Sequence, residues 1–237
     1  MFQGFPQSGL EFFMAIRFNN NREFFLENHG WYEEGVRTPA RLLAAALGET
    51  VRDLDPDLET RPEKVVSRIN RDVRFSKDKS PYRDYIWLAF RKPGVERKTT
   101  LGVYFDISDS GASYGMGFYD ENRPLMNALR RRILTEPEKV QEAVDSALGE
   151  FTLHANSFRR MAIPAEVPEP LKIWYALKGF YVEREVKDFD LIRSPALADE
   201  IKRGFKHLKP LYRYITSLTP EEEMTDPTKY GRAPDAK

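Results

Sequence analysis

Apolar residues recur at three- and four-residue intervals through residues 1–55, and this spacing predicts helices there. Ser8, followed three residues later by Glu11, has the form of a capping box that opens a short helix. Asn21 is placed to cap the next helix, in which Pro39 marks a kink or a break. The start of the chain is therefore expected to be helical.

The pattern changes between Lys64 and Phe118, where β-branched and aromatic residues gather in short runs. Lys92-Pro93-Gly94 and Asp109-Ser110-Gly111 have turn composition. The runs therefore predict neighbouring strands of one antiparallel sheet, at residues 65–69, 85–90, 99–107 and 113–119.

Helical spacing returns at residues 124–134 and 137–148, and a long helix is expected at 195–218 with Pro210 as a candidate bend. One or two further strands are expected between Phe151 and Phe189. Helices before and after a block of strands, with no flexible linker, predict a single α+β domain over residues 1–219. Residues 220–237 contain almost no apolar side chains and are expected to form a disordered tail.

Composition narrows the classes of partner. Lys plus Arg and Asp plus Glu number 37 each, so there is no bulk-charge signal for nucleic acid or an anionic membrane, and any anion recognition has to be local. The absence of Cys excludes disulfides, thiolate metal sites and a Cys nucleophile. No apolar stretch approaches the roughly 18 residues of a membrane span, and no signal peptide is recognisable, so we expect a cytoplasmic protein.

The densest run of charged residues lies between Arg68 and Tyr82. Its cations outnumber Asp72 and Asp78, and they alternate with apolar side chains that are expected to be buried. The cations are Arg68, Arg71, Arg74, Lys77 and Lys79, and the apolar residues are Ile69, Val73 and Phe75. A half-buried strand followed by a loop is favoured over a helix, because the run is rich in β-branched residues.

Distance limits how this run can bind one ligand. On a straight strand Arg68 and Arg74 would lie roughly 20 Å apart, too far to hold one small anion together. A site for a single ligand therefore requires the chain to bend near Asp72. Under that condition Arg71, Asp72 and Arg74 are the expected centre, and Arg68 is a supporting residue.

Three interpretations of the run remain open. In the first, Arg71 pairs with Asp72 or a distant carboxylate, and the charges form an internal ion-pair network of a structural or interaction protein. In the second, the run binds a small phosphate- or carboxylate-bearing ligand, because guanidinium forks match such groups. The candidate ligand-binding residues are then Arg68, Arg71, Arg74, Lys79 and Tyr82, oriented by Asp72 and Asp78.

The third interpretation is catalysis on an anionic substrate, with Asp72 or Asp78 as a base or metal ligand. A related alternative, a metal-assisted phosphodiesterase or nuclease, would use Asp84 with the Glu96-x-Lys98 triplet. Such triplets occur by chance in a chain this charged, so this alternative is the weakest. We take anion binding as the leading hypothesis; the sequence does not decide whether the protein is an enzyme.

The residue pattern resembles a known family. Arg68-x-x-Arg71-Asp72-x-Arg74-Phe75, followed by Asp78-Lys79-x-x-Tyr82, is similar to the signature of the domain of unknown function 2461 family. Four further matches extend the resemblance to about Leu218: Phe2-Gln3-Gly4-Phe5, the stretch from Arg17 to Glu23, Tyr114-Gly115-Met116-Gly117-Phe118, and Arg130-Arg131-Arg132-Ile133. The resemblance implies that the charged run belongs to the family's defining architecture. It implies no activity, cofactor or partner.

Other groups of residues give weaker signals of function. The segment from Asn19 to Glu23 is expected to be a helix cap and turn, although its amides could reach the charged run. Gly115 and Gly117 are expected to mark a bulge or tight packing. The three histidines, His29, His154 and His207, have no metal-ligand spacing, so no zinc site is expected. Cofactor, ligand identity and oligomeric state stay open.

Overall fold

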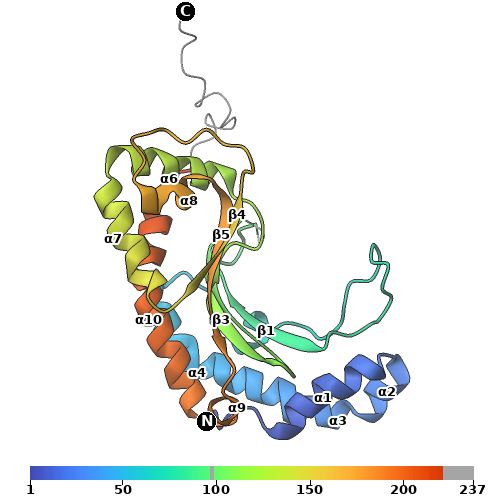
Figure 1. Ribbon diagram of the computed structural model, residues 1–237. Coiled ribbons are helices and arrows are strands. Elements are labelled where there is room, and N and C mark those ends of the chain that lie inside the picture. The colour runs from blue at the N-terminus through green and yellow to red at the C-terminus, as the bar shows by residue number, and fades with distance from the viewer. Residues whose placement is uncertain (97–98, 221–237) are drawn as a thin grey trace, which may run out of the picture. The chain divides into compact units, whose positions relative to one another are not determined.

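A computed structural model describes residues 1–96 and 99–220 of the chain (Figure 1). Residues 221–237 of the predicted tail lie outside the described residues, as does Lys98 of the predicted metal-binding triplet. The described chain contains helices and an antiparallel sheet of five strands, so the predicted α+β class is confirmed.

The strand order in the sheet is β1-β2-β3-β5-β4. The strands are β1 (Tyr85–Phe90), β2 (Gly102–Ser108), β3 (Gly111–Gly117), β4 (Thr152–Ser157) and β5 (Leu177–Val186). Three of the four predicted runs correspond to β1, β2 and β3, and the two strands expected between Phe151 and Phe189 are β4 and β5. Period two along β1 buries Ile86, Leu88 and Phe90, which leaves Tyr85 and Trp87 on the opposite face.

The chain divides into two compact units, each built from segments that are distant in sequence. The first unit comprises Met1–Pro93, Gly102–Tyr114 and Arg184–Lys206. The second comprises Gly94–Leu101, Gly115–Glu183 and the chain from His207. The charged run lies entirely in the first unit.

The first unit begins with helices, as predicted. They are α1 (Gln7–Phe18), α2 (Arg22–Glu27), α3 (His29–Tyr32), the π-helical turn η1 (Glu33–Arg37), α4 (Thr38–Leu54) and α5 (Pro62–Val65). Asn21 caps α2 as predicted, because its side chain accepts a hydrogen bond from the Phe24 N–H at 2.9 Å. The π-helical turn ends two residues before Pro39, which lacks the N–H that a continuous α-helix needs.

The predicted capping box at Ser8 is wrong. The first helix begins at Gln7, so Ser8 lies inside it, and Pro6 occupies the capping position without a side-chain hydrogen bond. A proline before the first turn disfavours a backward extension of the helix, because its ring clashes with the preceding residue in the helical conformation. The apolar residues of the helix are nevertheless buried as its spacing predicts: Phe12, Phe13 and Ile16 are fully buried.

Aromatic side chains join the sheet to the last helix in the core of the first unit. Phe205, on the first part of α10 (Ala196–Ser217), meets Phe90 and Tyr114 edge to face, with ring centroids 6.4 and 6.1 Å away. Phe5 stacks on Phe105 of β2 at 5.9 Å. The short helix α9 (Phe189–Ile192) accepts the Phe5 N–H through the Ile192 carbonyl, which fixes the N-terminal segment.

The predicted strand at residues 65–69 is not formed as a regular element. Val65 ends α5, and only isolated bridges, Val66 with Leu88 and Asn70 with Tyr82, pair this segment with the chain around β1. The reason lies at Ser67, whose hydroxyl accepts the Trp87 N–H at 3.0 Å. A side chain thus takes the place of a backbone carbonyl, and the ladder is interrupted there.

The second unit contains α6 (Arg123–Thr135), α7 (Pro137–Leu148), the 3₁₀ turn η2 (Glu169–Leu171) and α8 (Lys172–Tyr175), as well as β4 and the start of β5. The helices predicted at 124–134 and 137–148 are therefore confirmed. Gly115 and Gly117 mark tight packing: an added Cβ would lie 1.9 Å from the Val182 carbonyl oxygen at Gly115 and 2.3 Å from Tyr181 at Gly117. The absence of a side chain at these glycines therefore lets the neighbouring strand β5 approach closely.

One arginine of α6 is buried without a carboxylate. Arg130 is 3% exposed, and its guanidinium donates to the carbonyls of Tyr175 and Leu177 and to the side-chain oxygen of Asn127. Burial lowers the pKa of Arg130 to about 10, so it stays charged at neutral pH. Arg131 and Arg132 of the same helix are exposed, whereas Arg130 is a buried structural contact.

Candidate functional site

The charged run folds back on itself as an arm, here called the charged arm and defined as residues 68–83. Its two sides pair through the bridge between Asn70 and Tyr82. The Arg71 N–H donates to the Pro81 carbonyl and the Arg83 N–H to the Ile69 carbonyl, both at 2.8 Å. The chain therefore bends, and the bend brings Arg71 and Arg83 to neighbouring positions. In Figure 1 the arm runs out from the sheet beside β1.

The tip of the arm is held mainly by contacts between close neighbours in sequence. Arg74 donates to both carboxylate oxygens of Asp72, at 2.9 and 2.6 Å, and Lys79 donates to the Val73 carbonyl at 2.9 Å. Arg71 pairs with Asp78, which also accepts from Ser80. Ion pairs within the run therefore exist, but they are partly or largely exposed, and Arg71 pairs with the nearby Asp78 instead of Asp72 or a distant carboxylate.

Phe75 corrects the burial prediction. Its side chain is 95% exposed, although the sequence pattern places it among buried residues. No helix or strand among the described residues covers Phe75, and its described ring contact is the Arg74 guanidinium, 5.8 Å from the ring centroid. Ile69, which lies at the base of the arm, is buried as expected.

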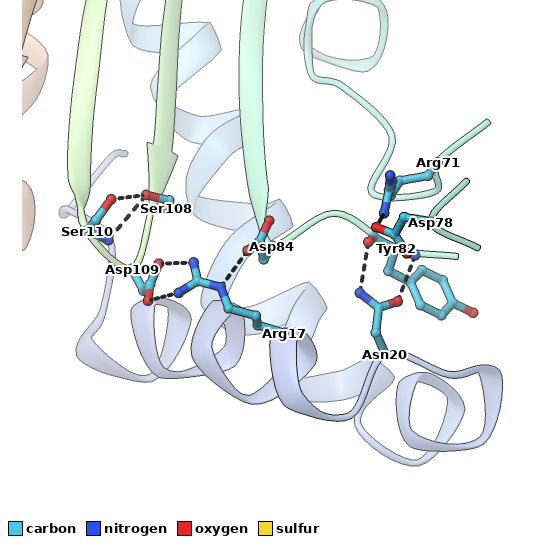
Figure 2. A network of polar contacts seen from close by, with 9 residues as sticks. All are labelled: Arg17, Asn20, Arg71, Asp78, Tyr82, Asp84, Ser108, Asp109 and Ser110. Carbon is cyan, nitrogen blue, oxygen red and sulfur yellow. Dashed lines mark hydrogen bonds and ion pairs between the residues drawn. The ribbon is translucent and has the colours of Figure 1, made fainter. Parts of the chain in front are cut away.

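Asn20 holds the backbone of the arm at Tyr82. Its side-chain amide donates to the Tyr82 carbonyl and accepts from the Tyr82 N–H, both at 3.0 Å (Figure 2). The Tyr82 ring stacks on Phe25 of α2, with centroids 4.3 Å apart. The segment was expected to be only a helix cap and turn; the Asn20 amide in addition reaches the charged run.

Arg17 joins α1 to the sheet. It donates to Asp84 at 2.6 Å and to both oxygens of Asp109 at 2.9 and 2.6 Å (Figure 2). These hydrogen bonds, to Asp84 first and then to Asp109, raise its pKa. Asp84 directly precedes β1, and Asp109 lies in the predicted turn between β2 and β3. A single guanidinium therefore fixes α1 against one end of the sheet, where β1 begins and β2 ends.

These side chains enclose an open cavity of about 380 Å³. It lies within the first unit, between the end of α1, the base of the charged arm and the start of β1. A volume of this size falls in the range of small-ligand sites. The lining residues are Arg17, Asn20, Arg71, Asp78, Ser80, Tyr82, Arg83, Asp84 and Tyr85.

Arg83 has a different environment from the other two arginines of the cavity. One terminal nitrogen donates to the carbonyls of Arg68, at 2.8 Å, and of Asn70. Its guanidinium carbon lies 4.8 Å from the centroid of the Trp87 ring. Within residues 1–96 and 99–220, neither a carboxylate nor any acceptor contacts its Nε or its other terminal nitrogen. Arg83 is therefore a fixed cation with unused donors at the cavity.

The cavity brings together some of the predicted site residues. Arg71, Asp78 and Tyr82 line it, whereas Arg68, Asp72, Arg74 and Lys79 do not. The latter side chains are exposed. Reasoning from sequence missed Arg17, Ser80, Arg83, Asp84 and Tyr85 as members of one cavity. A signal existed for two of them, because Arg17 begins one of the family-like stretches and Arg83 directly follows the charged signature.

The electrostatics of the two arm carboxylates bear on catalysis. The hydrogen bond from Arg71, and then those from Ser80, hold the pKa of Asp78 well below its usual range. The Arg74 guanidinium likewise lowers the pKa of Asp72 to about 2. A general base works best with a pKa near the pH of the reaction, so these ion pairs disfavour both residues in that role.

In the part of the chain that the structure describes, no group of three or more His, Cys, Asp or Glu side chains is arranged to hold a metal ion. Asp84, a candidate metal ligand of the phosphodiesterase alternative, is paired with Arg17. None of the helices among the described residues is long and apolar enough to span a membrane.

Comparison with known proteins identifies the family. A search of curated proteins found no match. The family model described as conserved hypothetical protein (DUF2461) matches residues 8–214, which include all of the charged arm, Arg17 and the residues that line the cavity. This match covers most of the 237 residues, and the chain therefore belongs to that family.

Proposed function

We propose that the protein binds a small anionic ligand, bearing a phosphate or carboxylate group, in the cavity at the base of the charged arm. Arg83 is the observation that carries this proposal. It is held in place by two main-chain carbonyls and an aromatic ring, and its remaining N–H groups lack an acceptor among the described residues. An arginine fixed in this way loses little freedom when an anion binds, and its planar fork suits an oxyanion.

Arg71 is the second proposed contact. Asp78 accepts from one of its terminal nitrogens, which leaves Nε and the other terminal nitrogen for a ligand. Arg17 contributes mainly by position, because Asp84 and Asp109 together occupy three of its donors. The cavity is thus lined by three guanidiniums and two carboxylates, a modest excess of positive charge that favours one anionic group.

A competing function is supported by a specific observation. The pairs of Arg17 with Asp84 and Asp109, and of Arg71 with Asp78, are what an internal ion-pair network without a ligand requires. In that case the protein would act as a structural or interaction protein. The two functions differ at Arg83, since a purely structural network gives no reason to leave a guanidinium without a carboxylate beside an open cavity.

Thermal unfolding with a panel of anions tests the proposal. The panel contains sulfate, inorganic phosphate, a phosphate monoester and a dicarboxylate. An anion at about 100 times its dissociation constant should stabilise the fold by about 2.7 kcal/mol. For a chain of this size, that corresponds to a rise of about 5 to 11 °C in the unfolding temperature.

Two substitutions locate the site. Arg83→Met keeps the length of the side chain but removes the charge, and it should abolish the anion-dependent rise. Arg74→Ala is the matched control, because Arg74 belongs to the same arm but lies outside the cavity; it should leave the rise intact. If no anion stabilises the wild type, or if Arg83→Met responds like the wild type, the proposal fails and the structural network stands.

A further inference from the structure

One wall of the cavity is aromatic. Tyr85 lines the cavity and is 42% exposed. Its ring centroid lies 5.8 Å from that of Trp87, the next residue on the same face of β1, with 31° between the ring planes. The buried residues Ile86 and Leu88 face the other way, so this aromatic pair is not part of the core of the first unit. A ligand held by Arg83 would therefore lie beside an exposed tyrosine ring.

The aromatic wall and the cations are joined by Arg83. The Arg83 guanidinium lies over the Trp87 ring, 4.8 Å from its centroid. Tyr85, two residues after Arg83 in the sequence, is the first residue of β1. Phosphate-binding donors and a ring that can stack are thus placed side by side. A bare oxyanion would use only the first, whereas a ligand that combines a phosphate with a planar apolar group would use both.

The charged arm continues this combination beyond the cavity. Residues 68–83 carry six cationic and two acidic side chains, a net charge of +4 in a chain whose formal charge is zero. Lys77 and Lys79 are exposed near the tip, and Phe75 between the two sides of the arm is 95% exposed. Although the whole chain is formally neutral, the arm is a local strip of cations. An exposed aromatic ring lies at each end of this strip, Phe75 near the tip and Tyr85 beside the base.

We propose, on the basis of the function proposed above, that the cavity receives one nucleotide of a single-stranded nucleic acid. Arg71 and Arg83 hold its phosphate, the base stacks on Tyr85, and the neighbouring phosphates lie along the charged arm. Proteins that bind single strands combine a cationic track for the backbone with aromatic rings for the bases. A duplex would not bind in this way, because its bases are already stacked and paired.

Fluorescence anisotropy with a labelled thymidine oligonucleotide of about ten nucleotides tests the inference, with the same sequence as a duplex, thymidine monophosphate and inorganic phosphate as unlabelled competitors. The single strand should bind more tightly than any of the other three. The slope of log affinity against log salt should be negative, with about 0.7 for each phosphate contact.

Two pairs of variants separate stacking from charge. Tyr85→Leu should weaken oligonucleotide binding about 5- to 150-fold, the range of a lost base–aromatic stack, whereas Tyr85→Phe should retain it. Lys77→Gln with Lys79→Gln should reduce the salt slope by about 1.4. The matched pair Lys187→Gln with Lys206→Gln, also exposed in the first unit but outside the arm, should leave the slope unchanged.

The results distinguish this inference from the proposed function. If phosphate or the mononucleotide binds and Arg83→Met abolishes that binding, but the oligonucleotide binds no more tightly, the anion site stands and the nucleic-acid inference is overturned. Equal affinity for single strand and duplex, or a Tyr85→Leu protein that binds like the wild type, also overturns it. If none of the four probes binds, both ideas fail.

Discussion

Two arginines of this protein are held by main-chain carbonyls instead of carboxylates, and their surroundings differ. Arg130, in the second unit, is 3% exposed and donates through three nitrogens to protein oxygens. Arg83, in the first unit, donates through one nitrogen and faces an open cavity. The same kind of contact therefore fixes a buried charge in one place and presents an unsatisfied one in the other. Exposure and unused donors, not the number of charges, separate the structural arginine from the candidate binding residue.

The largest expected loss of stability follows from substitution of Arg130. Arg130→Met should lower the free energy of unfolding by about 3–5 kcal/mol, because it leaves the carbonyls of Tyr175 and Leu177 and the Asn127 amide oxygen without their donor. Urea denaturation measures this. The control is Arg132→Met on the same helix, an exposed residue that pairs with Glu136 one turn away. If both variants unfold at the same urea concentration as the wild type, Arg130 is not a structural contact and the comparison fails.

Arg17→Met should have the next largest effect, a loss of about 1–2 kcal/mol. The Asp109 side chain is only 12% exposed and would lose its bidentate hydrogen bond from Arg17, while Asp84 would lose its ion pair. Denaturation at low and high salt provides the check, since the partly exposed pairs weaken as salt rises. A loss as large as that for Arg130→Met would mean that the cavity is part of the core framework.

Arg83→Met should cost less, about 1 kcal/mol in the free energy of unfolding, because water can reach the cavity and replace the lost donor at the two carbonyls. Its expected signature is loss of anion binding with the fold retained, measured by the same denaturation series beside the anion panel. A cost comparable to that of Arg130→Met would place Arg83 among the structural residues and remove the contrast between the two sites.

The smallest effect is expected for Arg74→Ala. Arg74 pairs with Asp72 on the exposed tip of the arm, and exposed ion pairs contribute little. Its unfolding midpoint and its affinity for anions should both equal those of the wild type within measurement error. A clear loss of anion affinity would move the site from the cavity to the tip, where the sequence had placed it.

The helices and strands could largely be predicted because their signals are local. Spacing alone located the helix from Pro137 to Leu148, and a short run of β-branched and aromatic residues located β1. The errors occur where a side chain replaces a backbone partner or where no facing element exists. Ser67 interrupts the expected strand by accepting the Trp87 N–H, and Phe75 stays exposed because no element of the described chain packs against it.

The members of the cavity could be predicted only in part. Arg71, Asp78 and Tyr82 belong to one dense run, so sequence spacing found them. Arg17 is far away in sequence and reaches the cavity only because α1 lies against the turn between β2 and β3, through Asp109. Arg83 has no sequence feature that sets it apart; its two carbonyl acceptors, with no carboxylate partner among the described residues, exist only after the arm has folded back.

The side chain of Asn20 has a further consequence. By pairing with both the N–H and the carbonyl of Tyr82, its amide takes the place that a neighbouring strand would have at that residue. Exposed strand edges can recruit other extended chains and start aggregation. Asn20 blocks this edge with a single residue, which allows the arm to carry its charged side chains into solvent without offering its backbone as a template.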